Sequence, residues 1–280
     1  MQNTSFISKL SHGVLKRIKG VFIPENKRAG LTWFREKYLK HAPEGKIRSY
    51  KYRGHKIYYN NPSEFLKTLK EIFINEIYKM DIPTDSFIID CGANIGLSTI
   101  YFKQICPTAE IIAFEPDKTN YELFVKNIDS FNLEKIIAKK EAVWIQDTEL
   151  TFSQDGNMGS KIDLEKSNSK ITMVKAVRLS DLLDKKIFFL KMDIEGAEYY
   201  VLKDISSKLN NVQTLFVEYH GKFSQSNELT EIFNIIQKAG FSYYIREAAD
   251  NHAYPLMAGG MMSDIPYDVQ LNIFCFKPDV

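Results

Sequence analysis

The stretch FIIDCGANIG, residues 87–96, decides the fold. An apolar run with the character of a core strand ends in Asp90 and leads directly into a short segment with two glycines. Gly92 and Gly96 permit positive φ angles and a close backbone approach, and Asn94 is of the non-glycine type that best tolerates the left-handed region. The stretch therefore predicts a narrow turn after a buried strand, with its main chain open to a ligand.

Downstream of this turn, short β-rich apolar runs alternate with helical patterns. Such alternation indicates right-handed βαβ crossovers and a parallel sheet with helices on both faces. The last two apolar runs have no convincing helix between them, so we expect an antiparallel pair at the sheet edge. The strands are expected at 86–90, 110–116, 135–144, 187–193, 214–220, 241–247 and 269–277, and the main helices at 96–106, 119–131, 198–205 and 227–240.

The region ahead of this fold has a different pattern. Residues 46–52 and 55–60 alternate apolar with polar side chains around Arg53-Gly54, which predicts a β-hairpin. A helix should follow from Ser63, whose hydroxyl can cap it, to Met80. We expect residues 1–80 to form an N-terminal helical and hairpin extension and residues 81–280 to form the main domain.

Charge is unevenly distributed along the 280 residues. The first 40 residues hold nine Lys and Arg against two acidic residues, although the whole chain is only +2. Residues 5–22 space their apolar side chains at helical intervals between basic ones, which predicts a basic amphipathic helix. It either packs on the body with a solvated basic face, or docks on an anionic membrane surface or an acidic partner.

Cysteine content and hydropathy restrict the choice of cellular compartment. Cys91, Cys106 and Cys275 are too few and scattered for a disulfide framework, and no C-x-x-C pair indicates structural zinc. No apolar run reaches the length of a membrane span, and no signal peptide is recognisable. We expect a cytoplasmic protein, with the basic N-terminus as a candidate for peripheral membrane contact. The near-neutral charge gives no indication of nucleic acid.

A second strand end strengthens the case for a ligand at the turn. Glu115 and Pro116 end the run IIAFEP, 25 residues after Asp90. An acid there can accept hydrogen bonds from both ribose hydroxyls of a nucleoside. The turn lacks the G-x-G-x-x-G and P-loop patterns that seat phosphates, so a nucleoside without phosphates is favoured. The alternatives are a simple turn and an exposed acid that caps the next helix.

Residues 87–220 carry an ordered set of motifs: FIIDCGANIGLSTIYF, EIIAFEPDKTNYELFVKNI, LKMDIEGAEYYVL and LFVEYH. Together they resemble the FkbM family of S-adenosylmethionine-dependent methyltransferases. The resemblance implies a class I, Rossmann-like methyltransferase fold (EC 2.1.1.-), S-adenosyl-L-methionine as cofactor, and O-methylation of a sugar or polyketide hydroxyl. It implies cofactor contacts from these residues: Asp90, Gly92, Ala93, Asn94 and Gly96 around the methionine part, Glu115 with Pro116 at the ribose, Glu141 and Ala142 beside the adenine, and Asp193.

Four polar residues follow the next two strands. Asp193 and Glu195 come after one strand, and Glu218 and His220 end the other, so they could form a facing quartet. His220 is the leading candidate for a catalytic base because its ordinary pKa lies near neutrality, and Asp193 is next. Alternatively, His220 is structural, Glu195 caps the following helix, or the carboxylates and His220 hold a divalent cation. We assign no metal from the sequence.

The acceptor side is less distinct. Residues 248–268 form a long connection in which His252, Tyr254, Met257, Met261 and Met262 could cover an acceptor, since methionine fits irregular surfaces. The same loop could instead be a subunit contact. The segment 153–162 could border the same opening.

The sequence thus predicts a methyltransferase that acts on a hydroxyl of a small-molecule or glycan acceptor, a saccharide or secondary metabolite, as in polysaccharide biosynthesis. Three alternatives remain at this point. One is a methyltransferase with a nitrogen or carboxyl acceptor, another is a nucleotide-dependent Rossmann oxidoreductase, and the third is a non-catalytic interaction module.

Overall fold

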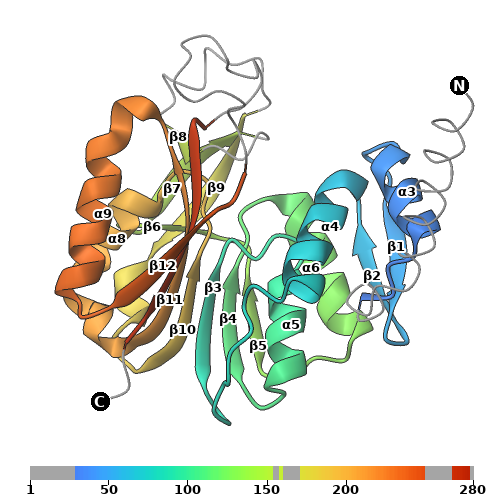
Figure 1. Cartoon of the computed structure of the whole chain (residues 1–280), viewed down its shortest axis with the longest axis horizontal. Helices are drawn as coiled ribbons and strands as arrows, with labels where there is room; N and C mark the ends of the chain where they lie inside the picture. Colours follow the sequence, from blue (N-terminus) through green and yellow to red (C-terminus); the bar gives the residue numbers. More distant parts are fainter. Residues whose placement is uncertain (1–28, 154–157, 160–170, 250–266, 278–280) are drawn as a thin grey trace, which may run out of the picture. The chain divides into compact units, whose positions relative to one another are not determined.

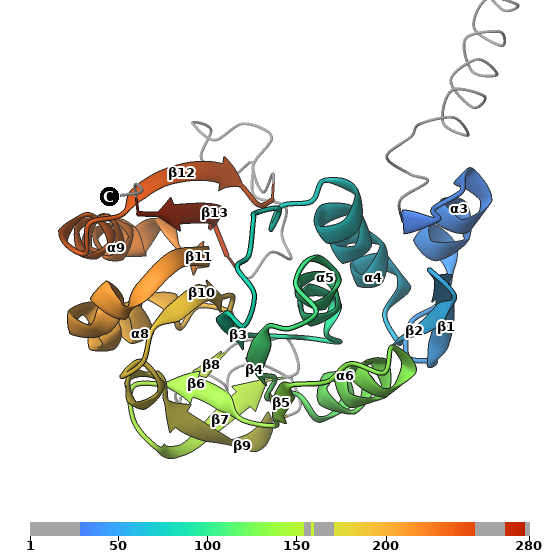
Figure 2. The same cartoon turned by 90° about the horizontal axis from the view of Figure 1, so that it is seen from below.

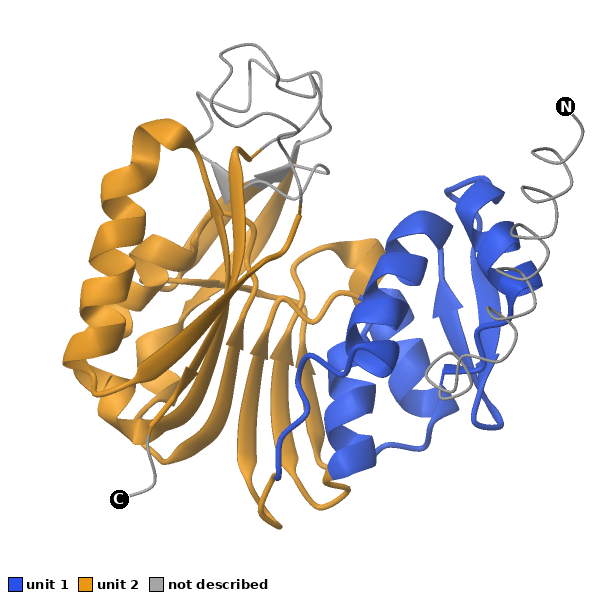
Figure 3. Cartoon of the chain, viewed as in Figure 1, with its two compact units in different colours: residues 1–81, 95–105, 122–133 blue, residues 82–94, 106–121, 134–280 orange. Residues whose placement is uncertain are grey.

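The computed structural model describes residues 29–153, 158–159, 171–249 and 267–277. The predicted basic helix at 5–22 and nearly all of the long loop at 248–268 lie outside these residues. The described chain divides into two compact units (Figures 1 and 3). Unit 1 comprises residues 1–81, 95–105 and 122–133, and unit 2 comprises residues 82–94, 106–121 and 134–280.

A seven-stranded mixed sheet forms the centre of unit 2 (Figure 2). Its order is β12-β13-β11-β10-β3-β4-β5. The five strands from β11 to β5 are parallel, whereas β13 runs antiparallel to both β11 and β12. The strands are β3 (Phe87–Cys91), β4 (Glu110–Phe114), β5 (Ile136–Lys139), β10 (Ile187–Met192), β11 (Val212–Gly221), β12 (Ser242–Glu247) and β13 (Val269–Phe276). The predicted α/β sheet with an antiparallel edge is confirmed.

The core of unit 2 lies between this sheet and two helices, α8 (Glu198–Ile205) and α9 (Ser226–Lys238), which lie on the same face (Figure 2). In register, Ile89 of β3 pairs with Leu190 on one side and Ile112 on the other. Side chains of β3 and β10 are buried almost throughout, because neighbours cover both their edges and their faces. The chain leaves α9 through Gly240, whose φ of +82° ends the helix as expected.

The predicted strand at 135–144 is wrong in one respect, since it is two strands in two sheets. β5 is the last strand of the large sheet, and its alternate residues are exposed. β6 (Ala142–Trp144) pairs in parallel with β9 (Ile171–Arg178) in a second, four-stranded sheet that also contains β7 (Thr148–Ser153) and β8 (Met158–Gly159). Ala142 is buried in a small cluster with Val174 and Ala176 of β9, whereas Val143 packs in the main core cluster together with Ile89 and Leu190.

Unit 1 contains the predicted hairpin, with β1 (Arg48–Tyr52) and β2 (His55–Tyr59) in antiparallel register. Its two turn residues, Arg53 and Gly54, have φ angles of +47° and +90°, as a type I′ turn requires. The unit also contains α3 (Trp33–His41), α5 (Leu97–Ile105) and most of α6 (Lys118–Ser130). Short 3₁₀ helices occur in unit 2 at Leu179–Leu182, Ser206–Asn211 and Phe223–Gln225.

The helix expected from Ser63 to Met80 starts earlier and ends earlier. α4 (Pro62–Leu69) is capped by Asn61, whose side chain accepts a hydrogen bond from the Glu64 amide. Pro62 at the first helical position needs no hydrogen-bond partner for its nitrogen, which favours this start over Ser63. The helix then widens into a π-helical segment, Lys70–Ile74, and Glu76 with a φ of +49° ends the helical region. None of the helices in the described part of the chain is long and apolar enough to cross a membrane.

Asn127 on α6 joins the hairpin to the rest of unit 1. Its side-chain amide donates to the carbonyl oxygens of Tyr58 (3.0 Å) and Ile95 (2.8 Å) and accepts from the Tyr58 amide (2.6 Å). The side chain is fully buried. The edge of β2 is thus fixed by a residue 69 positions later in the chain.

We expect Asn127→Ala to lower the free energy of unfolding by about 2–4 kcal/mol, because one buried and two partly buried backbone groups lose their partners at once. Chemical denaturation followed by circular dichroism measures the change. Asp129→Ala, at an exposed position of the same helix, is the matched control and should stay within about 0.5 kcal/mol of wild type. Equal effects of the two substitutions would refute the anchoring role of Asn127.

Candidate active site

The site lies where the strand order of the large sheet reverses. The chain proceeds from β3 to β4 on one side, and β10 and β11 lie on the other. In open α/β sheets, ligands bind outside the carboxyl ends of the strands at such a point. The residues that follow β3, β4, β10 and β11 in unit 2 are therefore the ones to examine.

The turn after β3 has the backbone conformation that the sequence predicts. Gly92 has a φ of +83° and Asn94 a φ of +50°. The amides of Gly92 and Ala93 donate to the carbonyl oxygen of Phe114, at 3.0 and 2.8 Å. A Cβ atom on Gly92 would lie 1.8 Å from the carbonyl oxygen of Asp193. The lack of a side chain on Gly92 thus lets the turn after β3 pack directly against the loop that follows β10.

Gly96 serves a different contact, within unit 1. Its φ is +86°, and a Cβ atom there would lie 2.2 Å from the ring of Phe124. The absence of a side chain lets the start of α5 pack against that ring. The expected cofactor contact of Gly96 stays a prediction.

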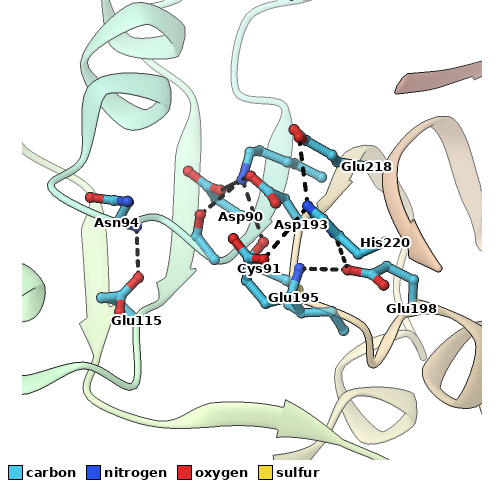
Figure 4. Close-up of polar contacts among 12 residues, drawn as sticks. Asp90, Cys91, Asn94, Glu115, Asp193, Glu195, Glu198, Glu218 and His220 are labelled. Atoms are coloured by element: carbon cyan, nitrogen blue, oxygen red, sulfur yellow. Dashed lines mark hydrogen bonds and ion pairs between the residues drawn. The ribbon is translucent and has the colours of Figure 1, made fainter. Parts of the chain in front are cut away.

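Glu115 is a buried carboxylate at the end of β4, with 6 % of its surface exposed. One carboxylate oxygen accepts from the Asn94 amide at 2.8 Å (Figure 4), and the other oxygen accepts from the Asp117 amide at 2.9 Å. Burial raises the pKa of Glu115 to about 8, against the effect of these two donors. Helix α6 is capped instead by Asp117, which accepts from the Asn120 amide, so Glu115 is not an exposed helix cap.

Lys191 is a buried lysine whose importance the sequence analysis missed. Its ammonium lies 3.3 Å from a carboxylate oxygen of Asp90 and 3.3 Å from one of Asp193, and donates to the Gly92 carbonyl at 2.9 Å. Asp90 is fully buried. One cation thus ties together the ends of β3 and β10. The sequence did contain one indication of this role, because Lys191 is the single charged residue inside the apolar run IFFLKM.

The four expected polar residues converge around His220 (Figure 4). Its Nε2 atom lies 3.6 Å from a Glu195 oxygen and 3.7 Å from a Glu218 oxygen. Ligand atoms of Asp193, Glu195 and His220 all lie within 4.8 Å of one another. The facing arrangement of the strand ends beyond β10 and β11 therefore exists in the structure.

Glu198 supports this group from behind. Its carboxylate lies 3.1 Å from Nδ1 of His220 and accepts from the amides of Ile194 and Gly196. It has no exposed surface. The sequence allows either a solvated Glu198 or one that supports the site, and the burial of this first residue of α8 beside β11 favours the second.

The charge state of His220 differs from the one expected. Burial disfavours the imidazolium, but the carboxylates of Glu198, Glu195 and Asp193 outweigh it and raise the pKa of His220 to about 10. The free protein at neutral pH therefore holds a protonated imidazole. The ordinary pKa on which the choice of His220 as a base rested does not apply to this buried, carboxylate-lined position, and a base role for His220 stays a prediction.

The loop after β10 holds Glu195 in an unusual conformation. Glu195 has a φ of +54°, followed by Gly196 at +94°. A non-glycine residue in the left-handed region is uncommon, and such residues cluster at functional sites. The Tyr267 hydroxyl donates to the Glu195 carbonyl oxygen at 2.7 Å, and its ring packs on the imidazole of His220. Tyr267 was also missed, because it lies just after a segment without a recognisable pattern.

Glu141 lies between β5 and β6, and Ala142 is the first residue of β6. Glu141 follows β5 and forms an ion pair with Lys175 of β9. Ala142 is buried in β6, opposite Ala176. Their expected position beside an adenine stays a prediction.

The strand order, the glycine turn after β3 and the buried acid after β4 define a class I methyltransferase. Residues 90–243 match the Methyltransferase FkbM domain. The chain is 30 % identical over 206 residues to Methyltransferase 1 of Beauveria bassiana, covering 62 % of this chain and 83 % of that protein. It is also 30 % identical over 176 residues to Methyltransferase sdnD of Sordaria araneosa, covering 50 % and 68 %. The chain belongs to the FkbM methyltransferase family.

Solved structures give more distant similarities. The Methyltransferase FkbM structure from Methylobacillus flagellatus is 17 % identical with a TM-score of 0.47, and the match covers 72 % of this chain but only 46 % of that one. The M. jannaschii TYW2 structure in complex with AdoMet is 13 % identical with a TM-score of 0.45, and the match covers 84 % and 90 %.

We expect Lys191→Met to destabilise the protein by about 3–5 kcal/mol, because it leaves the fully buried Asp90 without its cation. The double variant Lys191→Met/Asp90→Asn should recover part of that loss, as a double-mutant cycle of denaturation curves would show. Lys186→Met, at the exposed position just before β10, is the control. Additive single-mutant effects would count against a direct Lys191–Asp90 coupling.

Glu115 should make stability depend on pH. Its folded pKa of about 8 exceeds its ordinary value of 4.5, so the native state binds more protons between these two values. Its contribution should therefore weaken the fold as the pH rises from about 4.5 to 8, by about 1.4 kcal/mol for each unit of pKa shift. Relative to wild type, Glu115→Gln should gain stability over that range, and Glu110→Gln at the exposed start of β4 should not. Parallel pH profiles for wild type and Glu115→Gln would disprove this.

Proposed function

We propose that this protein is an O-methyltransferase that transfers a methyl group from S-adenosylmethionine to a hydroxyl of a saccharide or secondary metabolite. One observation carries the proposal. Asp193 touches the glycine turn through its carbonyl oxygen and belongs to the polar group around His220 through its carboxylate. A donor held by the turn and an acceptor held by the polar group would meet at this residue.

The residues of the turn fit the nucleoside part of the donor. Each oxygen of a carboxylate can accept about two hydrogen bonds, and each oxygen of Glu115 uses one for a backbone amide. In its ionised form, Glu115 therefore keeps one acceptor site per oxygen for the two ribose hydroxyls. Asp90, Gly92, Ala93 and Asn94 would surround the methionine part, with Pro116, Glu141 and Ala142 farther along the nucleoside. The donor, when bound, supplies a methyl group on a positively charged sulfur.

The polar group then has to align the acceptor and take its proton. Alignment of the reacting atoms can supply roughly 7–11 kcal/mol in favourable cases. A positioned base adds about 10²–10⁴ in rate. When the hydroxyl oxygen gains the methyl group, its O–H bond breaks, and the carboxylates of Asp193, Glu195 and Glu218 are the nearest groups that can accept the proton. His220 already carries a proton in the free protein and would stabilise the negative charge that develops on the oxygen.

The charge of the site bears on the class of acceptor. Carboxylates accept hydrogen bonds from neighbouring hydroxyls and repel an acceptor that is itself a carboxylate. This favours a hydroxyl over a carboxyl acceptor. An amine would also be attracted by these carboxylates, so the identity of the labelled product distinguishes oxygen from nitrogen transfer.

The test combines calorimetry with product analysis. Purified protein should bind S-adenosylhomocysteine, and Glu115→Gln should weaken that affinity by about tenfold or more through loss of about 1.4 kcal/mol or more at the ribose. Glu110→Gln, at the other end of the same strand, should bind as wild type does. With methyl-labelled donor and a panel of glycans, hydroxylated metabolites and amines, the label should enter an ether. Unchanged affinity in Glu115→Gln would refute the ribose assignment, and label on nitrogen would refute the hydroxyl acceptor.

A further inference from the structure

We propose that Asp193, Glu195 and His220 bind a divalent cation of the Mn²⁺ type, which holds the acceptor hydroxyl. This inference rests on the proposed function in one respect, namely that the acceptor binds beside Asp193. It goes further because it assigns a metal site to residues that were otherwise candidates for proton transfer.

The three ligand atoms have a spacing that suits one cation. One atom from each side chain lies within 4.8 Å of the other two. Two ligands on opposite sides of an ion are separated by about twice the bond length, which is about 4.2 Å for Mg²⁺ and about 4.6–5.2 Å for Ca²⁺. The side chains of Asp193 and Glu195 are 26 % and 46 % exposed, so they can rotate by the few tenths of an ångström that a smaller ion needs.

His220 is held as metal-bound histidines generally are. Glu198 fixes the Nδ1 side of the ring at 3.1 Å, and Glu198 is itself held by the amides of Ile194 and Gly196. A carboxylate behind the ring sets the orientation and basicity of a ligating imidazole. The Nε2 atom then points toward Glu195 and Glu218 (Figure 4), at 3.6 and 3.7 Å, both longer than a hydrogen bond. The ring is 2 % exposed, so it is aimed into this space by its packing.

The balance of charge around the space favours a cation. The side chains that meet there include the carboxylates of Glu195, Glu198 and Glu218 as well as Asp193, which already shares Lys191 with Asp90. Lys191 pairs with one oxygen of Asp193, and the proposed site would use the other oxygen as its ligand. A metal ion at Nε2 would displace the proton that the imidazole carries in the free protein, and its second positive charge would further lower the repulsion among the carboxylates.

The ligand types indicate which cation and what it does. Carboxylate oxygens suit Mg²⁺, Ca²⁺ and Mn²⁺, whereas an imidazole ligand is more typical of transition metals, so Mn²⁺ satisfies both. Three protein ligands leave about three positions of an octahedron open for water or for two neighbouring hydroxyls of an acceptor. A metal-bound hydroxyl loses its proton more readily. That proton would pass to Glu218, and the oxygen would keep the electron pair that forms the bond to the methyl carbon, while the sulfur–methyl bond of the donor breaks and its electron pair stays on sulfur.

The test measures metal binding by the full chain without donor or acceptor. Chelator-treated protein is titrated with Mn²⁺ and followed by calorimetry and electron paramagnetic resonance. We expect one site, with affinity reduced about tenfold or more, or by about 1.4 kcal/mol or more, in Glu195→Gln and in Asp193→Asn. Pulsed spectra should show coupling to a nitrogen nucleus, which only an imidazole among these three ligands supplies. Asp184→Asn, at an exposed carboxylate elsewhere in unit 2, should bind Mn²⁺ as wild type does.

The outcomes separate this inference from the proposed function. No Mn²⁺ binding at millimolar concentration, or binding that Glu195→Gln leaves unchanged, would overturn the metal site, while S-adenosylhomocysteine binding would still support the methyltransferase. Binding without nitrogen coupling would remove His220 as a ligand and overturn the site as stated. Because the Glu195 side chain is 46 % exposed, its variant should fold, and a circular dichroism spectrum like that of wild type verifies this.

Discussion

The candidate site depends on one interaction, the buried ammonium of Lys191 between the carboxylates of Asp90 and Asp193. Burying ions is costly unless they are paired and hydrogen-bonded, and Lys191 meets this condition by also donating to the Gly92 carbonyl. The contact joins the turn after β3 to the loop after β10, where any side chain on Gly92 would overlap the main chain of Asp193. The protein thereby fixes the geometry of both halves of the site before any ligand binds.

The arrangement of the sheet was largely predictable because burial leaves a direct record in the sequence. Strands such as β3 and β10 are covered on both faces, so their apolar runs locate them well. The prediction of one strand at 135–144 failed because an apolar pattern indicates burial but does not say in which core the side chains lie. Ala142 packs in the second sheet. The predicted start of α4 at Ser63 was wrong for a local reason. Asn61 and Ser63 are both good capping residues, and only the position of Pro62 makes Asn61 the better one.

The sequence was enough to predict which residues form the site, but not the charge states that determine its chemistry. Parallel strands end at one edge of a sheet, and this places Glu115, Asp193 and His220 near one another from topology alone. The partners that set their charge come from other elements. Glu198 lies on α8 and Tyr267 precedes β13, and neither position is implied by spacing along the chain. The pKa of His220 is a property of that assembled group, so a reference value for an isolated histidine could not supply it.

The contacts of Asn127 also affect the order in which parts of the protein can fold during synthesis. Its partner Tyr58 leaves the ribosome 69 residues earlier, and at translation rates of about 5–20 residues per second the hairpin waits roughly 3–14 s for the helix that holds it. During this interval Tyr58 lacks the two hydrogen bonds that it makes with the Asn127 side chain. Unit 1 is therefore completed only after part of unit 2 has been synthesised, so an N-terminal fragment that stops at residue 81 would lack two of the segments that complete its unit.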